Sequence, residues 1–466
     1  MRHCVARAPV MSASAAHSCP SPCTLDCGNG IGKVTAHHTK GPMIQASLAA
    51  GLARRLPFHY AWVILGVVCC ASIARVGPAV ATLSVFIGPM TAEFGWSRTE
   101  ISGAVSLGGI LAAFTSPMLG TFLDRKWPRT ILLMAVLTTG ITILLLSQVG
   151  NLAAFYLLFC IARMNFAGPF DLGILGGVVN WFVARRPLAF SMALVAQMAG
   201  LTLMPLIAFW AMEHGGWRTG WIAVGVAVLA AGFLPTWLLM VGRPEELGLG
   251  PETAKTDAQA TPGTTTPPEP TFTRTEALAT PTFWLLATFT MLAWPVQAGV
   301  SLHQAVHVTE RGLSMTTAVT GVTLFSAASG ISALLLGLAL RRLGVRAGLV
   351  LSALGMAIGT ALFGIVASHS DVMLAACIFG AGIGGMQTCL PVAWADYFGR
   401  KNFGAIRGVV LTIQVTAQAI GPLLSGVLRD WTGSYAFSHV TFAALAGTAV
   451  FIALFTRPPK PPTRIA

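Results

Sequence analysis

The sequence carries little charge for its length. Of its 466 residues, 10% are Asp, Glu, Lys or Arg, whereas 55% are hydrophobic, and the mean hydropathy is +0.72. Soluble domains average about 25% charged residues. Apolar runs of ~20 residues recur, and each could cross the membrane as a helix. The alternating pattern of membrane barrels is missing. These features predict an all-α integral membrane protein.

Motifs for ATP-driven or enzymatic chemistry are also missing. The sequence has no G-x-x-x-x-G-K-[ST] phosphate loop, which argues against ATP-driven transport. The glycine-rich run at Gly380–Gly385 lies within an apolar segment and indicates close helix packing instead. The net charge of +13 could suggest nucleic acid, but the basic residues sit in short loops between apolar runs. We therefore expect no enzyme activity, no cofactor and no nucleic-acid partner.

The nine cysteines do not predict disulfides. Cys19, Cys23 and Cys27 recur at a spacing of four, which could hold a metal, but their segment has no core-forming pattern and we expect no metal site. The cysteines from Cys69 onward lie within apolar runs and are interpreted as packing residues. Residues 1–55 are predicted to be a disordered tail, with Met43 as an alternative start.

Twelve apolar spans are predicted, six on each side of a polar linker. The linker contains ATPGTTTPPEP, Ala260–Pro270, which cannot form a packed core. The predicted organisation is a six-helix bundle at 56–242, a linker at 243–280, a second bundle at 281–457 and a tail at 458–466. The spans are expected near 60–90, 99–123, 128–149, 152–182, 187–212, 217–241, 281–308, 314–340, 347–368, 371–398, 403–429 and 434–456.

The two predicted bundles are copies of one unit. GTFLDRKWPR, Gly120–Arg129, matches GLALRRLGVR, Gly337–Arg346, and the same offset of 217 residues relates further pairs. These are Gly95 with Gly312, Pro78 with Pro295, and Gln197 with Gln414. The repeat predicts two pseudo-symmetric six-helix bundles in one chain.

The Lys and Arg residues predict the orientation in the membrane. Most of those between spans fall on one side, including Arg185, Arg186, Arg400 and Lys401, while the other side holds Arg98, Arg218, Arg311 and Arg429. By the positive-inside rule, both termini and the linker lie in the cytoplasm. We expect a multi-pass protein of the inner (plasma) membrane.

The chain resembles the major facilitator superfamily from residue 55 to residue 457. Twelve spans, a central linker and the G-x-x-x-D-R-x-x-x-R loop from Gly120 carry this resemblance. It implies secondary transport by alternating access, with spans one, four, seven and ten lining the cavity. Five segments resemble the bacterial monocarboxylate and oxalate–formate branch: Phe94–Ser102, Asn180–Ala193, Gly242–Glu252, Gly404–Gly408 and Gly421–Tyr435.

The loop after the second span is a candidate gate. Asp124, beside Arg125 and Arg129, could hold helix ends of the other bundle through charge-assisted hydrogen bonds. Gly120 would allow close helix approach. A cluster that breaks and re-forms would act as a two-state latch, although its charges could also simply anchor the loop at the lipid headgroups. The second copy offers Arg341 in place of the acid, and Arg346.

Three full charges are predicted well inside the spans: Arg75, Arg163 and Asp171. A charge at mid-bilayer costs about 2.5–3.5 kcal/mol on insertion scales, so each needs a reason. Arg75 precedes Pro78, which should kink the first span, as Pro295 should kink the seventh. Arg75 is our first candidate for binding a substrate anion, Arg163 the second, and Asp171 the candidate for proton coupling. Structural ion pairs are the alternative for all three, and for Asp171 the partner would be a basic residue on span one or two.

Further polar residues in the spans are weaker candidates. His303 and His307 share one helix face and could line the pathway or handle protons, or they could simply form a polar helix end. Gln197 and Gln414 could contact substrate or bond between helices.

These observations predict a secondary transporter, acting as a monomer, for a small organic anion. A monocarboxylate moved with protons or by exchange is favoured. One alternative is efflux of drug-like amphiphiles, against which span five lacks the G-P-x-x-G-G signature of such exporters. The other is a carrier-like membrane sensor without flux.

Overall fold

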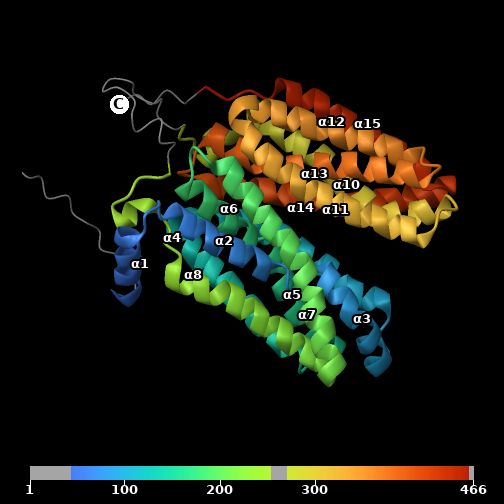
Figure 1. Ribbon diagram of the computed structural model, residues 1–466, viewed down its shortest axis with the longest axis horizontal. Coiled ribbons are helices and arrows are strands. Elements are labelled where there is room, and N and C mark those ends of the chain that lie inside the picture. Colours follow the sequence, from blue (N-terminus) through green and yellow to red (C-terminus); the bar gives the residue numbers. More distant parts are fainter. Residues whose placement is uncertain (1–42, 253–269, 461–466) are drawn as a thin grey trace, which may run out of the picture. The chain divides into compact units, whose positions relative to one another are not determined.

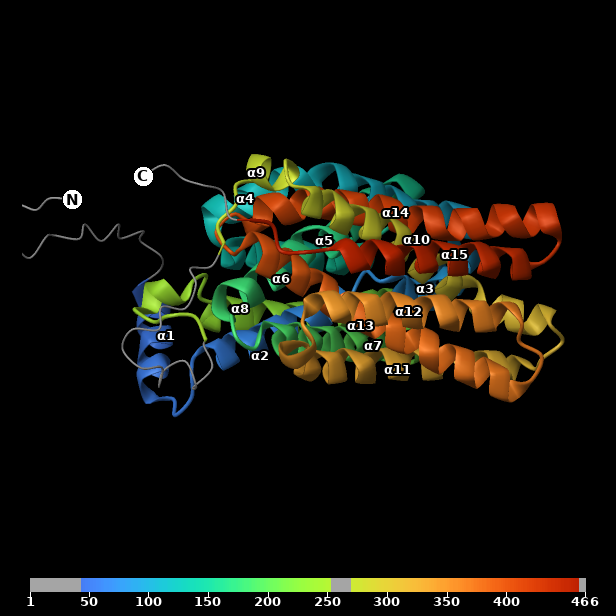
Figure 2. The same cartoon turned by 90° about the horizontal axis from the view of Figure 1, so that it is seen from above.

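The computed structural model describes residues 43–252 and 270–460, apart from the side chains of residues 43–48, 98, 99, 102 and 122–127. Within this part the chain is helical, and its only β contact is an isolated bridge between Phe182 and Glu252. A short helix, α1 (Met43–Arg55), precedes the apolar helices. The last part of the predicted disordered tail, residues 43–55, is therefore helical. Figures 1 and 2 show the helices from two directions.

The first half of the chain, α2 to α8, contains two spans that break partway along their length. The first span is α2 and α3, separated at residues 76–79, and the fourth is α5 and α6, separated at Gly168. The bounds are α2 (Ala61–Arg75), α3 (Val80–Phe94), α4 (Arg98–Leu146), α5 (Leu152–Ala167), α6 (Pro169–Trp181), α7 (Arg186–Val228), η1 (Leu229–Phe233) and α8 (Leu234–Leu239).

The second half follows a short 3₁₀ turn, η2 (Pro244–Leu247), and the short helix α9 (Arg274–Leu278). Its spans are single helices, and Ser or Thr side chains cap α10, α11, α13 and α15 by accepting from backbone N–H groups. The bounds are α10 (Pro281–Glu310), α11 (Met315–Leu343), α12 (Val345–Gly364), α13 (His369–Phe398), α14 (Phe403–Thr432) and α15 (Tyr435–Phe455). The predicted kink at Pro295 does not interrupt α10.

The number of spans agrees with the prediction. Eleven segments of the described chain are long and apolar enough to cross a membrane, but one of them runs from Arg186 to Leu239. Gly215 and Gly216 depart from helical geometry inside it, and Gly216 has a φ of 74°, which favours glycine. That segment is therefore two spans, and the predicted layout of twelve membrane helices is confirmed.

The two halves contact each other through α4 with α14 and through α7 with α11. Gly120 lies against Gly404 and Gly408, and a Cβ added at Gly120 would come within 3.0 Å of the Gly408 Cα. Gly337 lies in the same way against Ser191 and the Pro187 carbonyl of α7. Small residues let the backbones of neighbouring helices approach closely. Gly120 and Gly337, which begin the two copies of the repeated loop motif, thus lie at the contacts between the halves.

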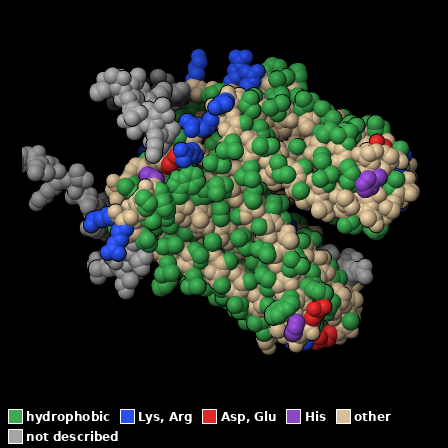
Figure 3. Space-filling view, viewed as in Figure 1, with side chains coloured by type: hydrophobic (Ala, Val, Ile, Leu, Met, Phe, Trp, Pro, Cys, Tyr) green, Lys and Arg blue, Asp and Glu red, His purple; other side chains and the backbone are tan. Residues whose placement is uncertain are grey.

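Ion pairs join the halves at the end that carries α1, η2 and α9, which we call the linker end. Arg186, almost fully buried at the start of α7, donates to Asp396 of α13 over 2.5 Å. Arg400 lies 2.9 Å from Glu245, between the end of α13 and η2. Lys and Arg side chains gather toward this end on the face seen in Figure 3, where a cleft separates the halves toward the other end. The halves are therefore closed at the linker end.

A larger side chain at Gly120 should open this closure. Spin labels at the exposed positions Thr130 and Arg342, in a background without native cysteines, report the separation of the halves. We expect Gly120→Val to shift the measured distances upward, because its side chain would overlap the α14 backbone. Gly109→Val is the matched control, since a Cβ there meets nothing within 4 Å. Equal distance distributions in both variants would refute the steric role of Gly120.

Candidate functional site

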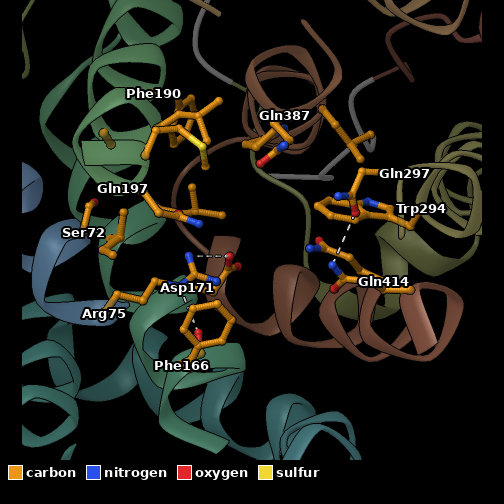
Figure 4. A pocket seen from close by; sticks show the side chains of 18 of the residues that line it. Ser72, Arg75, Phe166, Asp171, Phe190, Gln197, Trp294, Gln297, Gln387 and Gln414 are labelled. Carbon is orange, nitrogen blue, oxygen red and sulfur yellow. Dashed lines mark hydrogen bonds and ion pairs between the residues drawn. The ribbon is translucent and has the colours of Figure 1, made fainter. Parts of the chain in front are cut away.

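A cavity of about 280 Å³ lies between the two halves. Small-molecule sites are typically concave, largely apolar and equipped with a few converging polar groups. Here the polar groups come from α2, α6, α7, α10, α13 and α14 (Figure 4). The lining residues with polar side chains are Ser72, Arg75, Asp171, Gln197, Trp294, Gln297, Gln387, Arg407, Gln414 and Gln418.

Arg75 is the last residue of α2, where the first span breaks before Pro78. Its Nε donates to the Phe166 carbonyl over 2.9 Å, and its guanidinium carbon lies 4.9 Å from the centre of the Phe166 ring. Its Nη1 lies 3.4 Å from Asp171 Oδ1. The carbonyl it binds belongs to the last turn of α5, where helix termini leave backbone acceptors unpaired. The two helix breaks therefore meet at Arg75.

Asp171 lies in the first turn of α6, just after the break in the fourth span. Pro169 fits the first helical position, since it has no backbone N–H to lose there. A carboxylate in the first turn is stabilised by the positive end of the helix dipole. Asp171 is 6% exposed, so it is a buried charge that requires partners.

The second partner of Asp171 is Arg407, which comes from the other half. Its Nη2 and Nε donate to Asp171 Oδ2 over 2.9 and 3.2 Å, and Nη2 also donates to Gln414 Oε1 over 2.7 Å. Arg407 is 3% exposed, and its Nη1 has no hydrogen-bond partner among the described residues. Asp171 is thus held between guanidiniums of α2 and α14, and one buried donor remains unused.

Sequence reasoning missed Arg407. We expected three full charges inside the spans, but Arg407 lies in the second turn of α14 and forms a fourth. It belongs to GAIRG, which served only as a mark of resemblance. The signal was available: an Arg one turn inside a predicted span is a buried charge that needs a partner. The sequence analysis also did not predict the helix break at Gly168–Pro169, which positions Asp171, although a Gly-Pro pair inside a span indicates such a break.

The structure brings some of the predicted substrate residues together and leaves others apart. Gln197 and Gln414 line the cavity with Arg75 and Asp171. Arg163 does not line it: its guanidinium carbon lies 4.3 Å from the centre of the Phe166 ring, and its Nε has no partner among the described residues. Arg163 therefore supports the ring on which Arg75 also lies.

The predicted histidine pair is not at the cavity. His307 is buried at the far end of α10, with Nε2 2.8 Å from the Phe363 carbonyl and its ring against His439 of α15. His303 stacks on Tyr435. In the described part of the chain, no group of three or more His, Cys, Asp or Glu side chains could hold a metal ion.

The predicted gating loop is only partly described. The side chains of Asp124 and Arg125 lie outside the described residues, so their latch role stays a prediction. Arg129 is half-buried at the start of the third span, and Arg341 and Arg346 are exposed at the linker end. Gly120 makes the close helix contact described above.

Comparisons with known proteins place this geometry among membrane carriers. A family model described as the Major Facilitator Superfamily matches residues 76–322 and 298–466. The chain is 27% identical over 367 residues to the membrane sensor protein UhpC of Salmonella typhimurium, covering 75% of this chain and 81% of that protein. It is 28% identical over 81 residues, 17% of each chain, to human monocarboxylate transporter 2.

A solved structure shares the fold. The proton:xylose symporter XylE, bound to 6-bromo-6-deoxy-D-glucose, matches with a TM-score of 0.67 over 85% of this chain and 96% of its own, at 15% identity.

The pairing of Arg407 with Asp171 should appear as energetic coupling. Removing one partner of a buried ion pair costs about 3–5 kcal/mol, because the other charge is left unpaired. We expect Asp171→Asn and Arg407→Gln each to lower the melting temperature of the purified protein, and the double variant to lose less than the sum.

The exposed pair Arg429–Glu310 is the control for this cycle. Its nitrogen and oxygen lie 3.0 Å apart, with the Arg429 side chain 43% exposed. Exposed pairs contribute about 0–1 kcal/mol. Glu310→Gln should therefore change the melting temperature little, and additive losses in the Asp171–Arg407 cycle would disprove the coupling.

Proposed function

Because the chain belongs to the major facilitator superfamily, whose fold is that of transporters and not of enzymes, we propose that it carries a small organic anion by alternating access. The favoured substrate is a monocarboxylate, moved with protons or in exchange. The observation that carries this proposal is the buried set Arg75–Asp171–Arg407 in the cavity between the halves.

The charges of this set favour an anion. Two guanidiniums against one carboxylate leave a formal charge of +1 at the cavity wall. Moving an anion from water into a low-dielectric cavity costs desolvation free energy. Fixed positive charges in the cavity offset that cost. Arg suits the task because it stays charged and can grip a carboxylate with two parallel hydrogen bonds.

Asp171 occupies the place that a substrate carboxylate would take. It accepts from Arg407 and lies within ion-pair distance of Arg75. A substrate carboxylate arriving at the cavity could displace it from one guanidinium and use the free Nη1 of Arg407. Asp171 and Arg407 belong to different halves. That exchange would therefore weaken the contact between the halves and favour the conformation in which the linker end is open.

The proposed cycle opens and closes the linker end, which we assign to the cytoplasm on the basic residues of its loops. Opening it requires separation of Arg186 from Asp396, of Arg400 from Glu245 and of Arg407 from Asp171. The described arrangement is then the outward-facing state. Protonation of Asp171 would remove one of these ion pairs, which gives a physical route for proton coupling.

A carrier-like sensor is the second candidate. The 27% identity to UhpC over 75% of this chain favours it. A sensor could use the same anion site and the same conformational change without net flux. Uptake by purified protein in proteoliposomes separates the two functions, since a sensor would bind the anion and not accumulate it.

The anion site is tested by changing Arg75. Arg75→Lys keeps the charge but loses the forked donors, and Arg75→Gln loses both. We expect labelled monocarboxylate to bind about tenfold more weakly to Arg75→Lys and more weakly still to Arg75→Gln. Arg342→Gln, on an exposed residue of the linker end, is the control. Unchanged affinity in both Arg75 variants would rule out this anion site.

Proton coupling is tested by changing Asp171. Asp171→Asn should spare counterflow, which needs no net proton movement, and abolish accumulation driven by a pH gradient. Both rates are measured in the same proteoliposomes and normalised to folded protein. Gradient-driven accumulation that survives in Asp171→Asn would exclude the proton role.

The orientation is tested with reporter fusions. A reporter that is active only outside the cytoplasm, placed after Thr256 or at the C-terminus, should be silent. A fusion after Arg311, between α10 and α11, should be active and serves as the positive control. Activity at either of the first two positions would reverse the assignment.

A further inference from the structure

We propose that the carried anion is a polyhydroxylated monocarboxylate, such as the open-chain acid of a six-carbon sugar, and not a simple aliphatic acid. This inference rests on the proposed function and concerns the same cavity. The inference is based on the neutral polar groups around Arg75, Asp171 and Arg407, which are not needed to bind a carboxylate.

The cavity contains five glutamines, Gln197, Gln297, Gln387, Gln414 and Gln418. Each side-chain amide offers two donors and one acceptor oxygen. Only Gln414 serves the charged set directly, by accepting from Arg407, and Gln418 donates to Gln297 over 3.4 Å. A site for an aliphatic acid would need only positive charge and an apolar wall, which side chains such as Phe190 and Leu194 supply here. The five amides exceed that need, and they favour a ligand that also carries hydroxyls.

Several of these polar groups have unused hydrogen-bonding capacity. Neither Gln197 nor Gln387 has a side-chain hydrogen bond to another described residue. Trp294 Nε1 is buried and likewise has no partner among the described residues. Gln197 and Gln387 are half-buried residues that line the cavity, so their amides are available to pair with a bound ligand.

The open groups lie on both sides of the cavity. Figure 4 shows Gln197 near Arg75, with Gln387, Gln297 and Trp294 across the cavity on the second half. A carboxylate held at the Arg75–Arg407 end would therefore direct the rest of its chain toward amides of the opposite wall. Hydroxyls along that chain can both donate and accept, as an amide requires. The Trp294 ring offers an apolar face for the carbon backbone.

Size and charge agree with this class of ligand. The cavity volume of about 280 Å³ is close to the lower end of the range for small-molecule sites, about 300–1,000 Å³. The formal charge of +1 suits one carboxylate and leaves a second one uncompensated. An aliphatic acid of equal length would displace water from the amides without replacing the hydrogen bonds that this water makes. The unpaired amides would then lower the binding affinity.

The test compares four six-carbon probes. Gluconate carries one carboxylate and hydroxyls, hexanoate lacks the hydroxyls, glucose lacks the carboxylate, and glucarate has a second carboxylate. Binding to the full-length purified protein is measured by thermal stabilisation at equal ionic strength. Competition in proteoliposome counterflow gives relative affinities. We expect gluconate to bind at least about 100-fold more tightly than hexanoate, and glucose and glucarate to bind more weakly than gluconate.

A variant assigns the preference to the cavity. Gln387→Leu should weaken gluconate binding about tenfold or more and leave hexanoate binding unchanged or stronger, so the ratio between the two ligands falls. Gln148→Leu, on an exposed glutamine outside the cavity, is the matched control and should keep the wild-type ratio. A ratio unchanged in Gln387→Leu would contradict the role of this amide.

The outcomes separate this inference from the proposed function. If hexanoate binds as tightly as gluconate, the inference fails while the anion carrier stands. If glucose binds as tightly as gluconate, the carboxylate is irrelevant and the anion site itself fails. If no anion binds and none is transported, both fail.

Discussion

The structure depends on the burial of one carboxylate between two guanidiniums. Asp171 alone would be intolerable in an apolar bundle, and so would Arg75 or Arg407. Together they satisfy one another only when α2, α6 and α14 are in place, so the charged set fixes how the halves meet. The two helix breaks exist around it: the chain interrupts the first span at Arg75 and the fourth just before Asp171, and the carbonyl of Phe166 binds Arg75. Other contacts between the halves, such as those of Arg186 and Gly120, act at the same closed end.

Much of this architecture was predictable from the sequence. Hydropathy and the offset of 217 residues predicted twelve spans in two copies, and Gly120 predicted a close helix contact. Arg75 and Asp171 could be identified because charges in apolar runs are costly and therefore conspicuous. The orientation of the chain and the role of Asp124 stay predictions.

A pairing of Asp171 with a basic residue on the first or second span was one of the alternatives, and Arg75 on the first span is such a partner. The pairing of Asp171 with Arg407 could not be predicted in the same way. Asp171 and Arg407 are 236 residues apart, and nothing in the local pattern of α14 says which helix of the other half it faces. Arg163 is as conspicuous as Arg75 in the sequence, but its guanidinium packs over the Phe166 ring and does not line the cavity. Periodicity predicts which residues are inside a helix bundle, whereas the choice between cavity and packing depends on where the helices break and cross. His307 lies in the last turn of α10, which agrees with the polar helix end that the sequence also allowed.

The buried carboxylate also has a consequence for selectivity against small inorganic ions. A cavity that held only Arg75 and Arg407 would attract chloride, which could then pass through the proposed cycle as an uncoupled leak. With Asp171 in place, the resting cavity already contains its own counter-ion, and an incoming anion must outcompete it. A spherical ion with no second set of contacts competes poorly, whereas a ligand that also engages the amides can succeed. If the cavity binds the proposed anion, Asp171 would lower its affinity for every anion and favour those that also form hydrogen bonds with the amides.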